Sequence, residues 1–153
     1  MMNHIRMEFL SIPRNEALAR SVIGAFIACT DPTVEELADV RTAVSEAVTN
    51  AIVHGYRNTI GIVSMECWLR GNALTVLISD SGCGIEDVEQ AMQPFFTTGD
   101  EGERSGMGFA VMKAFMDRLS VESKPGEGTR VRMKKLLSAP CSAAEKDAVN
   151  GCR

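Results

Sequence analysis

Hydrophobic residues recur every three or four positions in residues 33–54, which is the spacing of one buried face of an α-helix. The apolar positions are Leu37, Val40, Val44, Ala47, Val48 and Ala51. Thr33 followed by Glu36 is a capping-box pattern, which predicts that the helix begins there. At about 100° per residue, Glu46 and Asn50 lie one turn apart beside the apolar face. We therefore predict a long, half-buried helix with a carboxylate and a carboxamide at its rim.

This pair of side chains has two interpretations. Glu46 as a proton acceptor and Asn50 as an oxygen ligand of Mg²⁺ would suit phosphate chemistry, because Mg²⁺ takes oxygen ligands and keeps several waters. Alternatively, both residues belong to an ordinary solvated helix edge. The choice between the two depends on loops that follow later in the chain.

Five segments have the composition and alternation of β-strands: 4–12, 60–69, 73–79, 118–123 and 129–137. Short glycine-containing turns join the second to the third and the fourth to the fifth, so two hairpins are predicted. The third segment is almost continuously apolar, as expected of a central strand. The first is expected at a sheet edge, where it could pair with a second copy of the chain. Its apolar alternation, together with the family resemblance given below, predicts a homodimer.

A second helix is predicted over residues 15–29, with Asn15 as its N-cap. The side chains expected to be buried are Leu18, Val22, Ala25 and Phe26. Glu16 and Arg20 would then face solvent one turn apart. Such a pair is most often a weak surface ion pair, and the other interpretation is a docking patch for a protein partner.

Bulk composition narrows the class of protein. The chain has 153 residues, 45% of them hydrophobic and 24% charged, which fits one globular domain. A formal charge of −4 does not indicate a basic surface that binds nucleic acid. No apolar run reaches the length of a membrane span. Five cysteines without a C-x-x-C pair fit free thiols in a reducing cytoplasm. Residues 138–153 lack periodicity and are predicted to be a disordered tail.

Glycine-rich stretches supply the candidate chemistry. Asp80 ends the central strand and is followed by Gly82 and Gly84, which would let the backbone approach a ligand closely. A simple Asp-Gly turn is the other interpretation. Residues 94–105 lack periodicity and are expected to form a lid, a binding loop or a disordered segment.

Another glycine-rich stretch, Ser105-Gly106-Met107-Gly108-Phe109, opens a predicted helix. Free N–H groups and the helix dipole favour an anion at such an end, so phosphate is the expected ligand. Arg104 would add a charge-assisted hydrogen bond to a phosphate oxygen. A surface loop without a ligand remains the alternative for this stretch taken by itself.

In this order, the helix pair Glu46 and Asn50, the Asp80–Ile85 turn, Pro94-Phe95-Phe96-Thr97-Thr98 and the stretch 105–109 resemble the ATP-binding fold shared by DNA gyrase, Hsp90, histidine kinases and MutL. They are most similar to its anti-sigma-factor serine kinase branch, over about residues 5–137. The resemblance implies an α+β two-layer sandwich, with helices packed on one face of a mixed, mainly antiparallel sheet. It also implies that residues 1–137 form one ATP-binding serine kinase and anti-sigma domain.

The resemblance further implies a role for individual residues. Asn50 would coordinate Mg²⁺ between the phosphates, and Glu46 would be the general base. Asp80 would accept a hydrogen bond from the adenine amino group, supported by Thr129 through water, and Arg104 would neutralise charge on the γ-phosphate. The remaining nucleotide-binding residues would be Gly82, Gly84, Ile85, Thr97, Thr98, Gly99, Ser105, Gly106, Met107 and Gly108.

Two functions from different classes follow from this resemblance. In the first, the chain uses Mg-ATP to phosphorylate a serine of an anti-anti-sigma protein and also inhibits a sporulation sigma factor. In the second, ATP or ADP only switches partner binding. Neither His4 nor His54 lies on a spare helix, which argues against autophosphorylation on histidine. The expected single domain has no room for a transducer domain, which argues against the gyrase type of ATPase.

Overall fold

The computed structural model describes residues 2–93 and 107–138. Its centre is a five-stranded sheet in the order β1-β2-β3-β5-β4. The strands are β1 (Met2–Leu10), β2 (Ile62–Arg70), β3 (Ala73–Asp80), β4 (Arg118–Lys124) and β5 (Gly128–Leu136). All four pairings are antiparallel, so the expected mainly antiparallel sheet is confirmed, whereas "mixed" is wrong for the described strands. β3 occupies the centre, as its apolar sequence predicts.

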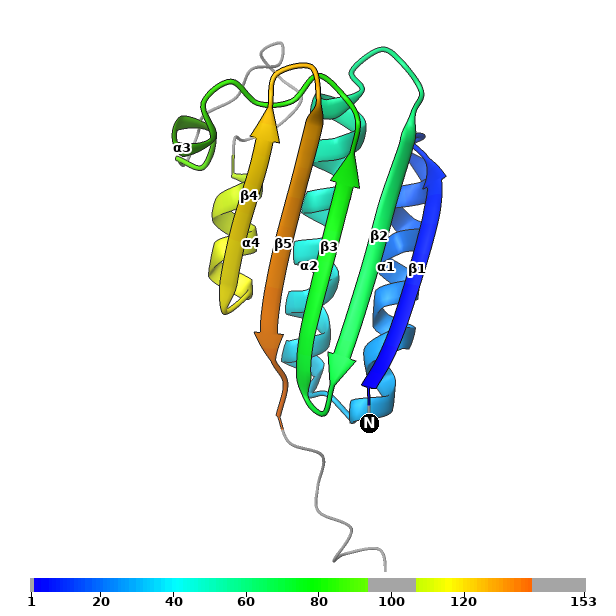
Figure 1. Cartoon of the computed structure of the whole chain (residues 1–153). Coiled ribbons are helices and arrows are strands. Elements are labelled where there is room, and N and C mark those ends of the chain that lie inside the picture. Colours follow the sequence, from blue (N-terminus) through cyan, green and yellow to red (C-terminus); the bar gives the residue numbers. More distant parts are fainter. Residues whose placement is uncertain (1, 94–106, 139–153) are drawn as a thin grey trace, which may run out of the picture.

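Helices cover one face of this sheet, as Figure 1 shows for α1, α2 and α4, and none of the described helices lies over the opposite face. The helical segments are α1 (Arg14–Ile27), η1 (Ala28–Thr30), α2 (Val34–Asn50), η2 (Ala51–Gly55), α3 (Val88–Ala91) and α4 (Gly108–Phe115). The two-layer α+β sandwich is therefore confirmed. No helix among the described residues is both long and apolar enough to cross a membrane.

The core lies between the two layers. Val40, Val44 and Val48 of α2 are fully buried against inward-facing side chains of the sheet, such as Met65 and Met133. Removing apolar surface from water in this way is the main force that holds the helices on the sheet. Cys67 belongs to the same core, and burial raises the pKa of its thiol to about 12, so this thiol stays protonated and unreactive.

The start of α2 agrees with the sequence prediction. The Glu36 N–H donates to Thr33 Oγ1 at 3.1 Å, and the Thr33 N–H donates to Glu36 Oε2 at 2.9 Å, which completes the capping box. The hydrogen bond from the Thr33 N–H is the main cause that lowers the pKa of Glu36. The same carboxylate also accepts hydrogen bonds from the N–H and hydroxyl of Ser138, at 2.6 and 2.8 Å.

Two predictions for α1 are wrong. Its buried side chains are Ala19, Ile23, Phe26 and Ile27, so only Phe26 of the predicted set is fully inside. Leu18 is 46% exposed because the helix is turned by about one residue from the predicted face. Asn15 is not the N-cap: the helix begins one residue earlier, after Pro13, and the Asn15 amide donates to the Leu10 carbonyl at 2.9 Å.

Candidate nucleotide-binding site

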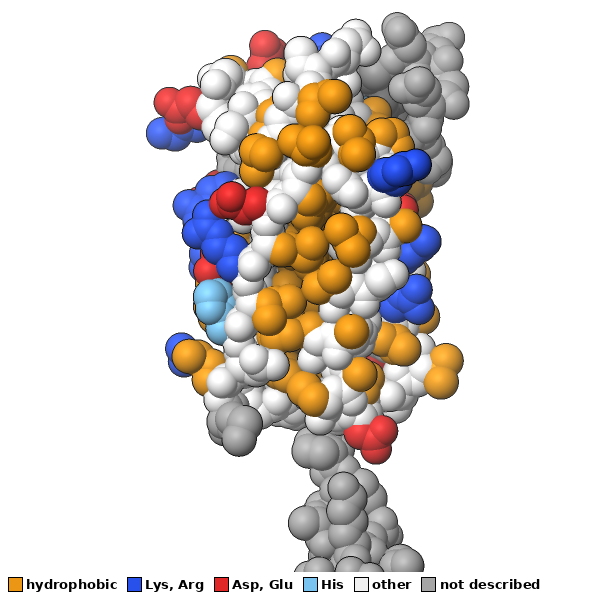
Figure 2. All heavy atoms as spheres, turned by 90° about the vertical axis from the view of Figure 1, so that its right-hand side faces the viewer, with side chains coloured by type: hydrophobic (Ala, Val, Ile, Leu, Met, Phe, Trp, Pro, Cys, Tyr) orange, Lys and Arg blue, Asp and Glu red, His pale blue; other side chains and the backbone are white. Residues whose placement is uncertain are grey.

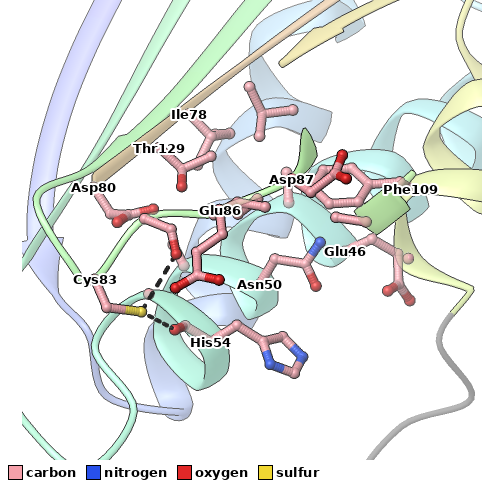
Figure 3. Close-up of a pocket in the computed structure, with 18 of the residues that line it drawn as sticks. Glu46, Asn50, His54, Ile78, Asp80, Cys83, Glu86, Asp87, Phe109 and Thr129 are labelled. Atoms are coloured by element: carbon pink, nitrogen blue, oxygen red, sulfur yellow. Dashed lines mark hydrogen bonds between the residues drawn. The ribbon is translucent and has the colours of Figure 1, made fainter. Parts of the chain in front are cut away.

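A cavity of about 890 Å³ lies between the end of α2, the loop after β3 and the start of α4. Figure 3 shows Asp80 and Thr129 toward one end of it and Glu46 toward the other, with Asn50 between them. The predicted site residues that line the cavity are Glu46, Asn50, Asp80, Gly84, Ile85, Met107, Gly108 and Thr129. Segments far apart in the sequence therefore meet here as predicted.

The first residue of α4 lies directly against Glu46 and Asn50. A Cβ atom added to Gly108 would stand 3.2 Å from both terminal atoms of Asn50 and 3.3 Å from Glu46 Oε2, tighter than most real contacts. Glycine here lets the N-terminus of α4, with its free N–H groups and positive dipole end, reach the two polar side chains. An anion at this point would be held by backbone N–H groups beside a carboxamide oxygen suited to a hard cation.

Asp80 lies at the opposite end, where β3 stops. Its Oδ1 accepts a hydrogen bond from the Gly82 N–H at 2.9 Å. Burial raises the pKa of this carboxyl, and hydrogen bonds from the backbone of Gly82 and Thr129 act in the opposite direction. The result is a partly buried acceptor whose remaining lone pairs are available to a ligand that brings N–H donors.

The two glycines after Asp80 are needed for close backbone contacts. A Cβ atom on Gly82 would stand 2.1 Å from the Gly55 carbonyl oxygen, and one on Gly84 would stand 2.1 Å from that of Lys124. Gly84 also has a φ of 72°, which side-chain-bearing residues rarely adopt. Their observed role is to shape the loop. The predicted approach of a ligand to this backbone stays a prediction, and Gly82, unlike Gly84, does not line the cavity.

The helix that carries Asn50 does not end as a regular α-helix. Its last turn, η2, is a π-helix in which the Tyr56 N–H donates to the carbonyl of Ala51 at 3.0 Å. The wider turn brings two carbonyls to Cys83: the Cys83 N–H donates to Gly55 at 2.8 Å, and its thiol donates to His54 at 3.1 Å. Cys83 thus fastens the loop after β3 to the end of the helix, a role that no local sequence signal indicates.

Ser123 of β4 is a second residue that the sequence prediction missed. Its hydroxyl contacts the N–H of Ile85, the carbonyl of Gly128 and the hydroxyl of Thr129. It therefore supports both sides of the cavity at the Asp80 end. A serine in an alternating strand carries no signal of such a role when the sequence is considered alone.

Several predicted residues are not in this cavity. Thr97, Thr98, Gly99, Arg104, Ser105 and Gly106 lie outside the described residues. Glu16 and Arg20 lie on α1 and do not line the cavity.

The predicted pair on α1 is only partly exposed. Arg20 Nη1 is 3.6 Å from Glu16 Oε1. The Glu16 side chain is only 21% exposed and also accepts a hydrogen bond from Ser45 of α2. Glu16 is thus less exposed than predicted, since it lies between two helices.

Among the residues described, no cluster of three or more His, Cys, Asp or Glu side chains could hold a metal ion by itself. If Asn50 binds a metal ion as predicted, oxygens of phosphate and water would supply further ligands. This fits Mg²⁺, which is commonly held by one or two protein oxygens together with substrate phosphates.

Comparison with known proteins gives consistent results. The family model described as histidine kinase-like ATPase domain matches residues 9–135. The anti-sigma F factor of Thermoanaerobacter sp. strain X514 is 56% identical over 137 residues, which are 90% of this chain and 96% of the relative. That of Caldanaerobacter subterraneus subsp. tengcongensis is 56% identical over 135 residues, which are 88% and 94% of the two chains.

A solved structure shares the fold at low sequence identity. The RsbU and RsbW domains of Rv1364c from Mycobacterium tuberculosis superpose with a TM-score of 0.65 at 18% identity, covering 91% of this chain and 33% of that chain. The sequence relatives, the family model and the fold therefore agree. This chain belongs to the histidine kinase-like ATPase domain family and, within it, to the family of the anti-sigma F factors.

Proposed function

We propose that this chain binds Mg-ATP or ADP in the cavity, phosphorylates a serine of an anti-anti-sigma protein, and binds and inhibits a sporulation sigma factor. The single observation that carries the nucleotide part is the close approach of Gly108 to Glu46 and Asn50, which leaves too little room for a Cβ atom. It joins an anion-binding helix end to a carboxylate and a carboxamide. The partner classes rest on the resemblance to the anti-sigma-factor serine kinase branch, and the anti-sigma role also on the names of the relatives.

In the proposed complex, Asp80 accepts a hydrogen bond from the adenine amino group, and the phosphates lie toward Glu46 and Asn50. Gly108 and the predicted residues Thr97, Thr98, Gly99, Ser105 and Gly106 surround the phosphates, and Arg104 neutralises charge at the γ-phosphate. Mg²⁺, held by Asn50, would neutralise phosphate charge when bound. The protein thus supplies mainly position and electrostatic stabilisation, which is what phosphoryl transfer requires.

The proposed reaction moves one phosphoryl group. The serine oxygen of the partner forms a bond to the γ-phosphorus, and the bond from that phosphorus to the β,γ-bridging oxygen breaks, which leaves ADP. Glu46 takes the proton of the serine hydroxyl. The test is transfer of label from γ-labelled ATP to a purified anti-anti-sigma protein. If nucleotide changes partner affinity but no label is transferred, the chain is a binding switch and the kinase proposal is wrong.

The partner surface is proposed to include Glu16 and Arg20. We expect Arg20→Glu to weaken binding to the sigma factor and the anti-anti-sigma protein about tenfold or more, because reversing a charge at an interface opposes complementary groups on the partner. ATP affinity should not change, since Arg20 does not line the cavity. Arg14→Glu, an exposed change on the same helix, is the matched control. Unchanged affinity for both partners in Arg20→Glu would exclude this surface.

The proposed homodimer has a different basis in the structure than in the sequence. Ile5, Met7 and Phe9 pack on the core of their own chain. The apolar face of the first strand is therefore covered within one chain and gives no support for a dimer. However, β1 is an edge strand, and Met2, Leu10 and Leu18 remain 57, 49 and 46% exposed. Figure 2 shows hydrophobic side chains running along this side of the molecule. An open strand edge with apolar neighbours favours pairing with a second copy.

Light scattering at micromolar concentration is expected to give twice the chain mass of 16.6 kDa. Leu18→Asp should shift the population toward the monomer, because it places a charge in the apolar surface. Leu136→Asp is the control, since Leu136 is also exposed but lies on β5, away from the β1 edge. A wild-type protein that stays monomeric would contradict the proposed dimer.

A further inference from the structure

Three hydrogen bonds meet at the side-chain oxygen of Ser123. The Ile85 N–H donates to it at 2.8 Å, the Gly128 carbonyl accepts its proton at 2.9 Å, and the Thr129 hydroxyl oxygen lies 2.8 Å away. Ser123 is only partly exposed, and Gly128 and Thr129 are buried. Buried polar groups left without partners are costly, so all three contacts are expected to be satisfied together.

Only one arrangement of the hydroxyl protons of Ser123 and Thr129 satisfies all three hydrogen bonds. A serine hydroxyl has a single proton and can accept two hydrogen bonds. The carbonyl of Gly128 can only accept, so it takes the proton, and the N–H of Ile85 occupies one acceptor position. The Thr129 hydroxyl must therefore donate to the second acceptor position of Ser123. The proton of Thr129 then points toward Ser123, and its oxygen keeps only acceptor capacity for any other group.

The direction of this proton affects the cavity. Thr129 is 9% exposed, lines the cavity and is the cross-strand partner of Asp80. Figure 3 shows the two side chains next to each other at the same end. Asp80 presents a carboxylate there, and Thr129 presents hydroxyl lone pairs. This end of the cavity consequently offers acceptors to the ligand, either directly or through a water that donates to Thr129.

We propose that Ser123 is a positioning residue for base selection: it holds the Thr129 hydroxyl as an acceptor, so that the site favours a purine with a 6-amino group over one with a 6-oxo group. This inference rests on the proposed binding of ATP. A 6-amino group brings two N–H donors to these acceptors. A 6-oxo group brings lone pairs, and it finds no donor while the Thr129 proton is engaged by Ser123.

Replacing Ser123 changes this selection without touching the ligand. In Ser123→Ala, the Thr129 hydroxyl loses its acceptor and is free to turn its proton into the cavity, where it can serve a 6-oxo group. The affinity ratio of ATP to inosine triphosphate should then fall about fivefold, which corresponds to about one neutral hydrogen bond. Ser123→Thr keeps a hydroxyl and should keep the ratio. Ser120→Ala, an exposed change on the same strand, is the matched control.

The experiment measures both affinities by calorimetry, in the presence of Mg²⁺, for wild type and each variant. Thr129→Val is included because it removes the same acceptor while leaving the Ile85 and Gly128 hydrogen bonds of Ser123 in place. It should also lower the ratio, and adding Ser123→Ala to it should lower the ratio no further. This non-additivity distinguishes positioning from a general loss of stability.

The possible results distinguish the positioning role of Ser123 from the proposed binding of ATP. A lower ratio in Ser123→Ala, with the ratio retained in Ser123→Thr and Ser120→Ala, supports the positioning role. If wild type prefers ATP but Ser123→Ala weakens both nucleotides equally, Ser123 is only structural and this inference is wrong. An unchanged ratio in Thr129→Val overturns it as well, even if Ser123→Ala does not fold. If wild type binds neither nucleotide, the proposed function fails too.

Discussion

Asp80→Asn is expected to weaken ATP binding about 10- to 100-fold while leaving the protein folded. A hydrogen bond to a charged group contributes about 1.5–3 kcal/mol, and the asparagine amide would also place a donor near the adenine amino group. The Gly82 N–H keeps an acceptor if the carboxamide oxygen takes the position of Oδ1. Calorimetry with ATP and Mg²⁺ measures this loss.

The stability of Asp80→Asn should be equal to or higher than that of wild type at neutral pH. Burial raises the pKa of Asp80, so the ionised carboxylate is less favourable in the folded than in the unfolded state. For such a group, the free energy of unfolding decreases as the pH rises from the pKa of the carboxyl in the unfolded state to its higher pKa in the folded state. The neutral amide of asparagine does not titrate and avoids this loss. A thermal melt at pH 7 checks the sign.

The same raised pKa predicts how ATP affinity depends on pH. The ionised carboxylate is the acceptor for the adenine amino group, so affinity should fall as the pH falls through the pKa of Asp80. Because that pKa lies above its ordinary value, the fall should begin at a higher pH than for a solvent-exposed aspartate. Asp80→Asn should lose this part of the pH dependence. Glu122→Gln, which removes an exposed charge from β4, is the control.

An ATP affinity of Asp80→Asn equal to that of wild type would exclude Asp80 as the base contact.

Glu46→Gln is expected to slow phosphoryl transfer about 10²- to 10⁴-fold, the usual contribution of a general base. Glutamine has nearly the same shape, so the contact with Gly108 should be kept and ATP should still bind. The rate is measured as label transferred to the anti-anti-sigma protein in a single turnover. The ATP affinity is measured separately on the same preparation.

A matched control for this variant lies on the same helix. Glu35→Gln makes the same chemical change at an exposed position in the first turn of α2 and should not alter transfer. Label transfer at the wild-type rate in Glu46→Gln would remove Glu46 as the base. Loss of ATP binding in the variant would instead assign Glu46 to nucleotide binding, which would also contradict its proposed role.

Much of the fold follows from local patterns in the chain. The five strands, the long helix and its capping box appear in the structure close to their predicted positions, because each depends on periodicity or on residues three or four positions apart. For the same reason Glu46 and Asn50 share one rim of α2. Asp80 also lies where predicted, at the end of a central strand.

The wrong predictions concern choices that local patterns leave open. Both Leu18 and Ala19 lie in apolar stripes of α1 that differ by one residue, and packing on the rest of the core buries Ala19 and exposes Leu18. The helix periodicity of residues 33–54 gives no sign of the π-turn at its end. That turn is accompanied by hydrogen bonds from Cys83, which lies 29 residues beyond His54.

The sequence by itself determined which residues form the elements and which polar side chains stand at their ends, because those properties depend on near neighbours in the chain. Only the tertiary structure decided how these ends meet. It places Gly108 against Asn50, the Gly55 carbonyl against Gly82, and Ser123 against Thr129. Such contacts depend on the packing of segments distant in sequence, and single-residue patterns do not record which segments will touch.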